Sequence, residues 1–169
     1  MRKYAFYGLL VLLSSGLISC LKNRDNDTCN LQEVKAEAPE AEVLSLEQYL
    51  EENSITAQKH PSGLYYIIET PGAGLVAEPC SIVAAIYTGK FTNGEIFDSS
   101  EGTPIAFRLG QVIAGWQMGL KLIQPGGKIK LFIPPSLGYG PADKVDMDGK
   151  VVIPGNSTLI FDVELVDVQ

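Results

Sequence analysis

The chain has 169 residues, of which 46% are hydrophobic and 20% are charged. This length predicts one domain with short additional segments, and the hydrophobic fraction excludes wholesale disorder. The net charge of −7 argues against a surface that binds nucleic acid. A single histidine, His60, excludes most histidine-based metal sites, and we expect neither a metal nor another cofactor. The 17 glycines and 10 prolines indicate many turns, as in a β-rich domain.

Residues 1–19 have the layout of a secretory signal peptide. Their apolar run, residues 4–13, is shorter than the roughly 20 residues that span a membrane. The ending at residues 17–20 resembles the bacterial lipoprotein signal, which implies cleavage before Cys20 and lipidation of its thiol. The protein would then be anchored by lipid to a membrane of a bacterial cell envelope, on the periplasmic or surface side. An uncleaved N-terminal anchor, or an ordinary signal with an accidental cysteine, is the alternative.

Residues 20–42 are predicted to be a flexible tether, because they are largely polar and have no apolar periodicity. Two cysteines follow Cys20 in the chain, namely Cys29 and Cys80. An exported compartment permits a disulfide between them, and two free thiols are the other possibility.

A short helix followed by a linker is expected over residues 43–59. Ser45 and Gln48 have the spacing of a capping box, which predicts that the helix begins there and ends near Asn53. Its apolar residues lie on one face. That face could pack on the domain, or it could pair two copies of the chain as a homodimer.

From residue 60 onward, apolar runs alternate with turn residues, and this pattern defines a domain over 60–169. Asn93 and Gly94 form a strong hairpin signal. Residues 112–123 have helical spacing, although two glycines weaken that helix. A long loop is expected over 134–154. Strands are predicted over residues 63–69, 81–88, 90–92, 95–97, 105–109, 128–133 and 159–168. The sum is an α+β architecture, an antiparallel sheet with one short helix across it.

The sequence lacks most enzyme signatures. It has no nucleophile-elbow motif and no glycine motif for phosphate or dinucleotide binding. His60 adjoins Pro61 at the domain edge, where a surface linker residue is a simpler interpretation than a catalytic one. Residues 146–149 resemble half of a calcium-binding loop but lack the later ligands, so we interpret them as a solvated turn.

Aromatic and apolar residues stand at the ends of the predicted elements, beside turn residues. Six such blocks occur in the order found in FKBP-type peptidyl-prolyl isomerases, and the chain resembles this family over about residues 61–168. The blocks are Tyr87–Gly89, Gly94–Ser100, Val112–Trp116, Tyr139–Gly140, Ile153–Pro154 and Leu159–Leu165. The resemblance implies a bent antiparallel β-sheet wrapped around one short α-helix, with an apolar pocket between them. It also implies cis/trans isomerisation of Xaa-Pro bonds, with proline-containing segments of exported proteins as substrates and immunosuppressive macrolides as further ligands.

The same resemblance assigns roles to individual residues of the pocket. Trp116 would form the floor, Asp98 would be the main polar group, and the Tyr139 hydroxyl would donate to a ligand carbonyl. The backbone N–H of Ile153 would bind another carbonyl. The expected catalytic residues are Tyr87, Phe97, Asp98, Trp116, Tyr139 and Phe161, and the expected substrate-binding residues are Phe107, Val112, Ile113, Val152 and Ile153.

The sequence departs from the family pattern at four places. Residues 101–103 contain no basic partner for Asp98. Ile105 stands where an aromatic residue is common, and Gly155 replaces the second proline of an Ile-Pro-Pro motif. The loop 139–154 is somewhat long, yet far too short for the inserted chaperone domain of some relatives. A non-catalytic module that binds peptides, or acts as a chaperone, is therefore the alternative to an isomerase.

Overall fold

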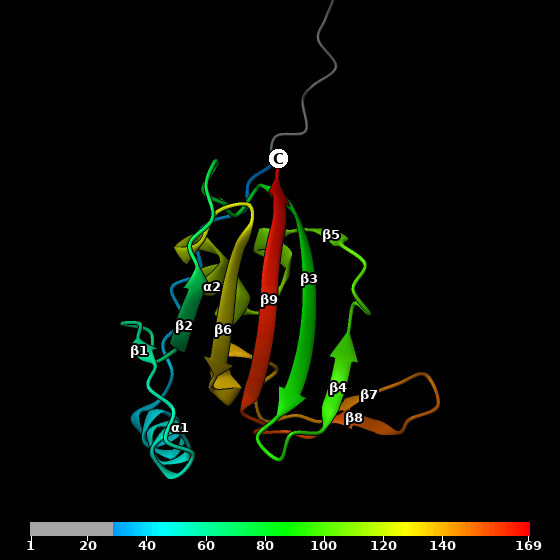
Figure 1. Cartoon of the computed structure of the whole chain (residues 1–169). Coiled ribbons are helices and arrows are strands. Elements are labelled where there is room, and N and C mark those ends of the chain that lie inside the picture. Colours follow the sequence, from blue (N-terminus) through cyan, green and yellow to red (C-terminus); the bar gives the residue numbers. More distant parts are fainter. Residues whose placement is uncertain (1–28) are drawn as a thin grey trace, which may run out of the picture.

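An antiparallel sheet of seven strands forms the centre of the computed structural model, which describes residues 29–169. Its strands are β1 (Gln58–Lys59), β2 (Tyr65–Thr70), β3 (Ile82–Phe91), β4 (Ile96–Ser99), β5 (Ile105–Arg108), β6 (Gly127–Ile133) and β9 (Leu159–Val168). The strand order is β1-β2-β6-β9-β3-β4, and β5 pairs with the first half of β3 (Figure 1). The predicted α+β fold is confirmed, and β9 has the predicted bounds. The predicted signal peptide and Cys20 lie outside the described residues.

One short helix, α2 (Ala114–Gly119), lies across one face of the sheet (Figure 1). The 3-10 turns η1 (Leu109–Gln111) and η2 (Leu120–Leu122) flank it, so the predicted helix over 112–123 is α-helical for only six residues. The two glycines that weaken this helix allow it to approach β6 closely. A Cβ on Gly115 would lie 2.6 Å from Ile133, and one on Gly119 would lie 2.5 Å from Leu131.

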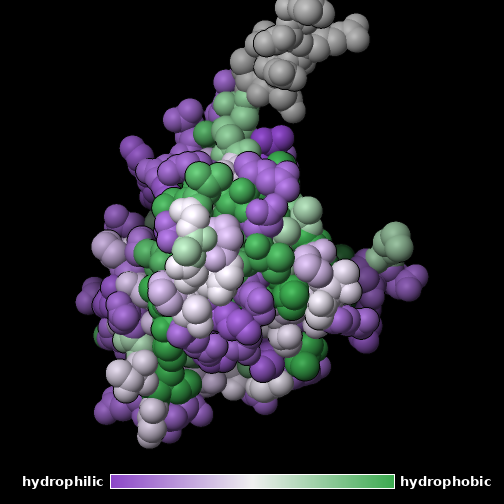
Figure 2. Space-filling view, turned by 45° about the horizontal axis from the view of Figure 1, so that its top comes forward, coloured by the Kyte–Doolittle hydropathy of each residue, from purple (hydrophilic) through white to green (hydrophobic). Residues whose placement is uncertain are grey.

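Alternation along β6 determines which side chains face the helix. Ile129 and Leu131 are buried in the core beneath α2. Lys128 and Lys130, the residues before them, form ion pairs with carboxylates of β9 on the opposite face. This period of two confirms the one-sided strand that the sequence predicted. On the face drawn in Figure 2, hydrophilic surface surrounds separate hydrophobic patches.

The helix α1 (Glu40–Glu52) begins earlier than the sequence predicted. It starts directly after Pro39, without a side-chain cap, so Ser45 lies inside the helix and the predicted capping box is wrong. Its end agrees with the prediction, because Asn53 is the C-cap. Within residues 29–169, no helix is both long enough and apolar enough to cross a membrane.

The apolar face of α1 packs against the chain's own sheet. Phe132 and Ile160 extend from the sheet face opposite α2 and meet this helix in a second apolar cluster. The helix contributes three buried side chains, Val43, Leu46 and Leu50. The face that could have paired two copies of the chain is therefore already covered by the domain.

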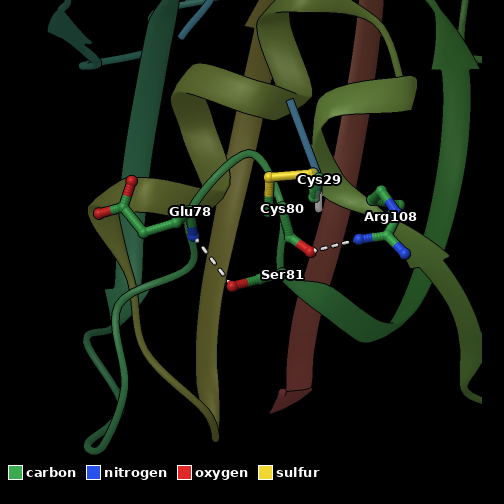
Figure 3. The surroundings of a disulfide bond; sticks show 5 residues. All are labelled: Cys29, Glu78, Cys80, Ser81 and Arg108. Carbon is green, nitrogen blue, oxygen red and sulfur yellow. Dashed lines mark hydrogen bonds between the residues drawn. A yellow bond between two sulfur atoms is a disulfide. The ribbon is translucent and has the colours of Figure 1, made fainter. Parts of the chain in front are cut away.

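The segment over residues 29–38 is attached to the domain, so the predicted tether does not extend over it. Cys29 and Cys80 form a disulfide, with their Cα atoms 5.8 Å apart (Figure 3). The backbone N–H of Ala38 donates to the Ser62 carbonyl at 2.8 Å, and apolar side chains of the segment pack on the core. Because the two cysteines are 51 residues apart, closing this loop in the unfolded chain stabilises the fold by about 4 kcal/mol in the loop-entropy model.

The predicted long loop over 134–154 contains short elements of its own. These are η3 (Pro135–Leu137), β7 (Lys144–Val145) and β8 (Val151–Ile153). The last two form a hairpin that projects from the lower right of the domain in Figure 1. At its tip the Asp146 carboxylate accepts the N–H groups of Asp148 and Lys150, at 3.0 and 2.9 Å. This exposed turn is the solvated turn that the sequence predicted.

Candidate functional site

A cavity of about 310 Å³ opens between α2, the strands β3, β4 and β5, and the start of the long loop. We call it the aromatic pocket. Its lining residues are Tyr87, Asp98, Ile105, Phe107, Gln111, Val112, Ile113, Trp116, Tyr139 and Phe161. The volume is at the lower end of the range of small-molecule sites, about 300 to 1,000 Å³, and suits a single ring or side chain. The structure thus brings together eight of the eleven residues that the sequence predicted for the site.

Trp116 forms the floor of the aromatic pocket and is only 5% exposed. The rings of Tyr87 and Phe161 meet it edge to face, with centroid distances of 5.1 and 5.2 Å. The Phe107 ring lies 5.4 Å away, tilted. Such perpendicular pairs are favourable, because the positive edge of one ring faces the negative face of another. The buried indole N–H has no hydrogen-bond partner among residues 29–169.

Phe97 is not among the residues that line the cavity, and its catalytic role stays a prediction. Its ring lies against Phe161, which does line the cavity, at 5.4 Å, and against Phe91 at 4.9 Å. Gly89 makes this packing possible, because a Cβ there would lie 2.7 Å from the rings of both Phe97 and Phe161. The glycine of the Tyr-Thr-Gly block therefore allows the rings of Phe97 and Phe161 to pack closely over β3.

Val152 and Ile153 also lie outside the aromatic pocket. Both belong to β8, and neighbouring residues of a strand point to opposite sides. Ile153 is 8% exposed and belongs to the main core, whereas Val152 is 42% exposed. The carbonyl-binding role of the Ile153 N–H stays a prediction.

Two tyrosines surround the single carboxylate of the aromatic pocket. The Tyr87 hydroxyl donates to Asp98 at 2.8 Å, and the Ser99 N–H donates to the same carboxylate at 2.9 Å. Burial, and then the hydrogen bond to Asp98, raises the pKa of Tyr87 to about 12. Burial, and then the charge of Asp98, also raises the pKa of Tyr139. Both phenols are therefore neutral near neutral pH and can donate hydrogen bonds.

Tyr87 is expected to make the protein less stable as the pH rises above its ordinary pKa of 10.0. The folded state holds the phenolic proton more tightly than the unfolded state, so this stabilisation is complete below pH 10.0 and is lost as the pH rises through about 12. The Tyr87→Phe variant should lack this part of the decline. Urea unfolding on both sides of pH 10.0 measures it. Identical pH profiles for the variant and the wild type would contradict the assignment.

Three residues that shape the aromatic pocket were not predicted as site residues. Ile105 and Gln111 line it; Gln111 is next in the chain to Val112, and Ile105 is two residues before Phe107. Ser100 is 5% exposed and fixes the backbone of Tyr87, since its N–H donates to the Tyr87 carbonyl and its hydroxyl accepts the Tyr87 N–H, both at 3.0 Å. The family pattern already singled out position 105, and Gln111 adjoins a predicted residue, whereas the matched block Gly94–Ser100 contains the serine without indicating its role.

His60 takes no part in the aromatic pocket. It lies between β1 and β2, where its Nδ1 shares a hydrogen bond with the Ser62 hydroxyl at 2.8 Å. His60 is half-buried rather than fully exposed as expected of a surface linker residue, and this burial lowers its pKa. Across residues 29–169, no three histidine, cysteine, aspartate or glutamate side chains are grouped so that they could hold a metal ion.

The bent sheet, the short helix and the aromatic pocket between them define a domain that can bind a small apolar group. Residues 76–166 match the family model for FKBP-type peptidyl-prolyl cis-trans isomerases. The chain belongs to this family, as the sequence predicted.

Similar proteins carry the name of the same family. The chain is 50% identical over 110 residues to a probable FKBP-type peptidyl-prolyl cis-trans isomerase of Haemophilus influenzae, an alignment that covers 64% of this chain and 44% of that protein. It therefore spans less than half the length of that relative. The crystal structure of FkpA from Escherichia coli matches with a TM-score of 0.66 and 41% identity, covering 76% of this chain and 60% of that one. An isomerase structure from Pseudomonas syringae matches with a TM-score of 0.65 and 29% identity, covering 79% and 98%.

Proposed function

We propose that the protein catalyses cis/trans isomerisation of Xaa-Pro bonds in exported proteins and so assists their folding in the bacterial cell envelope. The observation that carries this proposal is the aromatic pocket, with Trp116 as its floor and the rings of Tyr87, Phe107 and Phe161 around it. Membership of the isomerase family supports the same activity.

The reaction needs no nucleophile, because no bond is broken. Rotation about an Xaa-Pro amide has a barrier of about 20 kcal/mol, since resonance is lost in the twisted state. The twisted amide has less charge separation between oxygen and nitrogen than the planar one. A pocket that excludes water therefore raises the energy of the planar ground state more than that of the twisted state. An acceleration of about a millionfold requires only about 8 kcal/mol.

Each polar group of the aromatic pocket has a role in this proposal. The Tyr139 hydroxyl would donate to a carbonyl of the substrate and hold the peptide while the amide rotates. Asp98 would hold Tyr87 through its hydrogen bond and orient that ring against the proline. Val112 and Ile113 would bind the residue before the proline, since they line the same cavity.

Tyr139→Phe is expected to lower kcat/KM for a proline peptide by only about two- to tenfold, because one hydrogen bond is lost while the ring stays in the wall. A protease-coupled isomerisation assay measures the change. Tyr66→Phe is a matched control, since that hydroxyl bonds Gln58 at the surface, at 3.2 Å. A fall of about 100-fold in Tyr139→Phe would show instead that the hydroxyl takes part in the chemistry.

The activity itself is tested with the same assay on the wild type and on Asp98→Val. We expect the wild type to accelerate isomerisation clearly and the variant to be much slower. If both proteins stay at the uncatalysed rate while the wild type still binds the peptide, the enzyme proposal fails. The alternative, a non-catalytic peptide-binding or chaperone module, would then hold. One observation favours that alternative, namely that Asp98 has no ion-pair partner within residues 29–169.

Macrolides are proposed as further ligands of the aromatic pocket. They combine an apolar ring with several carbonyl groups, and the pocket offers aromatic walls together with the hydroxyl of Tyr139. Ile105 replaces an aromatic wall residue, so we expect weaker macrolide binding than in family members that have a ring there.

We further propose that lipid on Cys20 anchors the protein to a membrane of the envelope. The resemblance of residues 17–20 to the lipoprotein signal supports this, and the Cys29–Cys80 disulfide fits an oxidising compartment. Labelling of cells with a radioactive or clickable fatty acid should mark the wild type and leave Cys20→Ser unmarked. Cys29→Ser serves as a thiol control that keeps the label. Label that persists in Cys20→Ser would refute the anchor.

A further inference from the structure

The loop that carries Cys80 contacts residues 107–113, which form one wall of the aromatic pocket. Three hydrogen bonds join residues 79–81 to residues 108–110. The Arg108 guanidinium donates to the Cys80 carbonyl at 2.8 Å, and Figure 3 shows this contact beside the disulfide. The N–H groups of Leu109 and Gly110 donate to the carbonyls of Ser81 and Pro79, at 3.0 and 2.8 Å. The last strand residue of β5 and the η1 turn are thus fixed to one short loop.

The disulfide fixes that loop to the N-terminal segment. Cys29 is bonded to Cys80, and Leu31 packs so closely on the wall that a Cβ on Gly110 would lie 2.9 Å from its side chain. Lys121 of η2 forms ion pairs with Glu33 of the segment and with Glu78 of the loop. The segment, the loop and η2 therefore form one support behind the pocket.

The other side of the same wall faces the ligand space. Phe107, next to Arg108, packs its ring on Trp116. Val112 lines the cavity, and its carbonyl accepts the Gln117 side-chain N–H at 2.7 Å. Residues 107–113, which we call the pocket wall, are therefore held from α2 at one end and from the disulfide loop at the other.

We propose that Arg108 and the Cys29–Cys80 disulfide are positioning groups for the pocket wall and thereby determine how tightly the aromatic pocket binds a proline peptide. The inference rests on the proposed use of this pocket for such peptides. Arg108 is not among the residues that line the cavity, and one of its guanidinium N–H groups donates to the Cys80 carbonyl. Its effect on binding passes through the placement of Phe107 and Val112. Small displacements matter in such a wall, because shape complementarity to the proline ring is the basis of binding.

The test uses the full chain with its disulfide formed, and a proline-containing tetrapeptide as the probe. The chain has one tryptophan, Trp116, so intrinsic fluorescence reports the pocket floor directly. We expect Arg108→Gln to raise the Kd of the peptide about three- to tenfold and to shift the emission of Trp116. Arg108→Lys, which keeps a charged donor, should recover part of the affinity. The double variant Cys29→Ser/Cys80→Ser should raise the Kd by a similar factor. When it is combined with Arg108→Gln, the Kd should rise by less than the product of the two separate factors.

Lys128→Gln is the matched control, because it removes a positive charge and an ion pair with Glu164 on the far face of the sheet. Its Kd and its Trp116 emission should equal those of the wild type. A purely structural effect would change the stability of Arg108→Gln and leave the Kd of its folded form unaltered, and that result would overturn the proposal. If the double cysteine variant does not fold, Arg108→Gln with the disulfide intact decides alone. A wild type that binds the peptide without isomerising it would overturn the proposed function, while the Kd comparison would still decide this inference.

Discussion

Trp116→Ala is expected to lower kcat/KM for a proline peptide by at least about 100-fold, or about 2.7 kcal/mol. The indole contacts the rings of Tyr87, Phe107 and Phe161, so its removal opens the floor to water and loosens three walls at once. Water in the pocket would solvate the planar amide and cancel the differential destabilisation on which catalysis depends. The isomerisation assay measures the loss.

The same variant should also lose about 3 to 5 kcal/mol of unfolding free energy, because a large buried side chain is truncated. Circular dichroism must therefore confirm that the assayed protein is folded. Trp116→Phe is the control, since the indole N–H makes no hydrogen bond within the described residues and a phenyl ring keeps the floor apolar. It should keep most of the activity. A Trp116→Ala protein that is folded and within tenfold of the wild type would contradict the mechanism.

Gly115→Ala is expected to reduce both stability and activity, although alanine is the better helix former by about 1 kcal/mol. The new methyl group would lie 2.6 Å from the buried side chain of Ile133. Overpacking of this kind costs about 1 to 3 kcal/mol, and relief requires α2 to move away from β6. Trp116 is the next residue, so the pocket floor would move with the helix. Urea unfolding and the isomerisation assay measure the two effects.

Gly94→Ala separates these two effects. Its backbone has a φ of +86°, so alanine is strained there, but the added Cβ would meet nothing within 4 Å. This variant should therefore lose stability and keep its kcat/KM, because the hairpin turn does not line the aromatic pocket. If Gly115→Ala is as stable as the wild type, β6 can move aside for the added methyl group. Our claim that Gly115 is needed for close packing of α2 on β6 would then be wrong.

The strands could be predicted from the sequence because burial on one face leaves a period of two. In β6, lysines alternate with buried isoleucine and leucine, and the prediction was within one residue of the observed Gly127–Ile133. The start of α1 could not be predicted in the same way. This helix has no capping side chain, and its position is determined by packing of its apolar face on Phe132 and Ile160. Such tertiary contacts leave no local signal at Glu40.

The attachment of residues 29–38 to the domain could not be predicted from the sequence either. The segment is held by a cysteine pairing, a backbone hydrogen bond from Ala38, the ion pair between Glu33 and Lys121, and the packing of Val34, Ala36 and Ala38 on the core. Its alternating apolar residues are few and small, and the other contacts produce no apolar pattern. Composition alone therefore indicated a free tether where the fold has an ordered segment.

Most of the aromatic pocket followed from the family resemblance, although three of the predicted residues are not among those that line the cavity. Asp98 lines it, whereas Phe97 lies at an irregularity in the pairing of β4 with β3, where Asp98 is opposite Gly89 and Ile96 is opposite Lys90. On β8, Ile153 is buried in the core and Val152 is exposed, and neither lines the cavity. A pairing irregularity of this kind leaves no mark in the sequence, so the exact position of the Phe97 ring could not be predicted.

The position of the disulfide limits how far the domain can move from a lipid anchor. With lipid on Cys20, the chain between the anchor and the first covalent fixed point, Cys29, is residues 21–28. Even fully extended, it reaches no more than about 30 Å. Without the bond, the free length would extend toward Ala38 and about double that reach. If Cys20 carries lipid as proposed, the Cys29–Cys80 bond would therefore keep the domain within a thin layer above the bilayer, where polypeptides emerging through the membrane would meet it first.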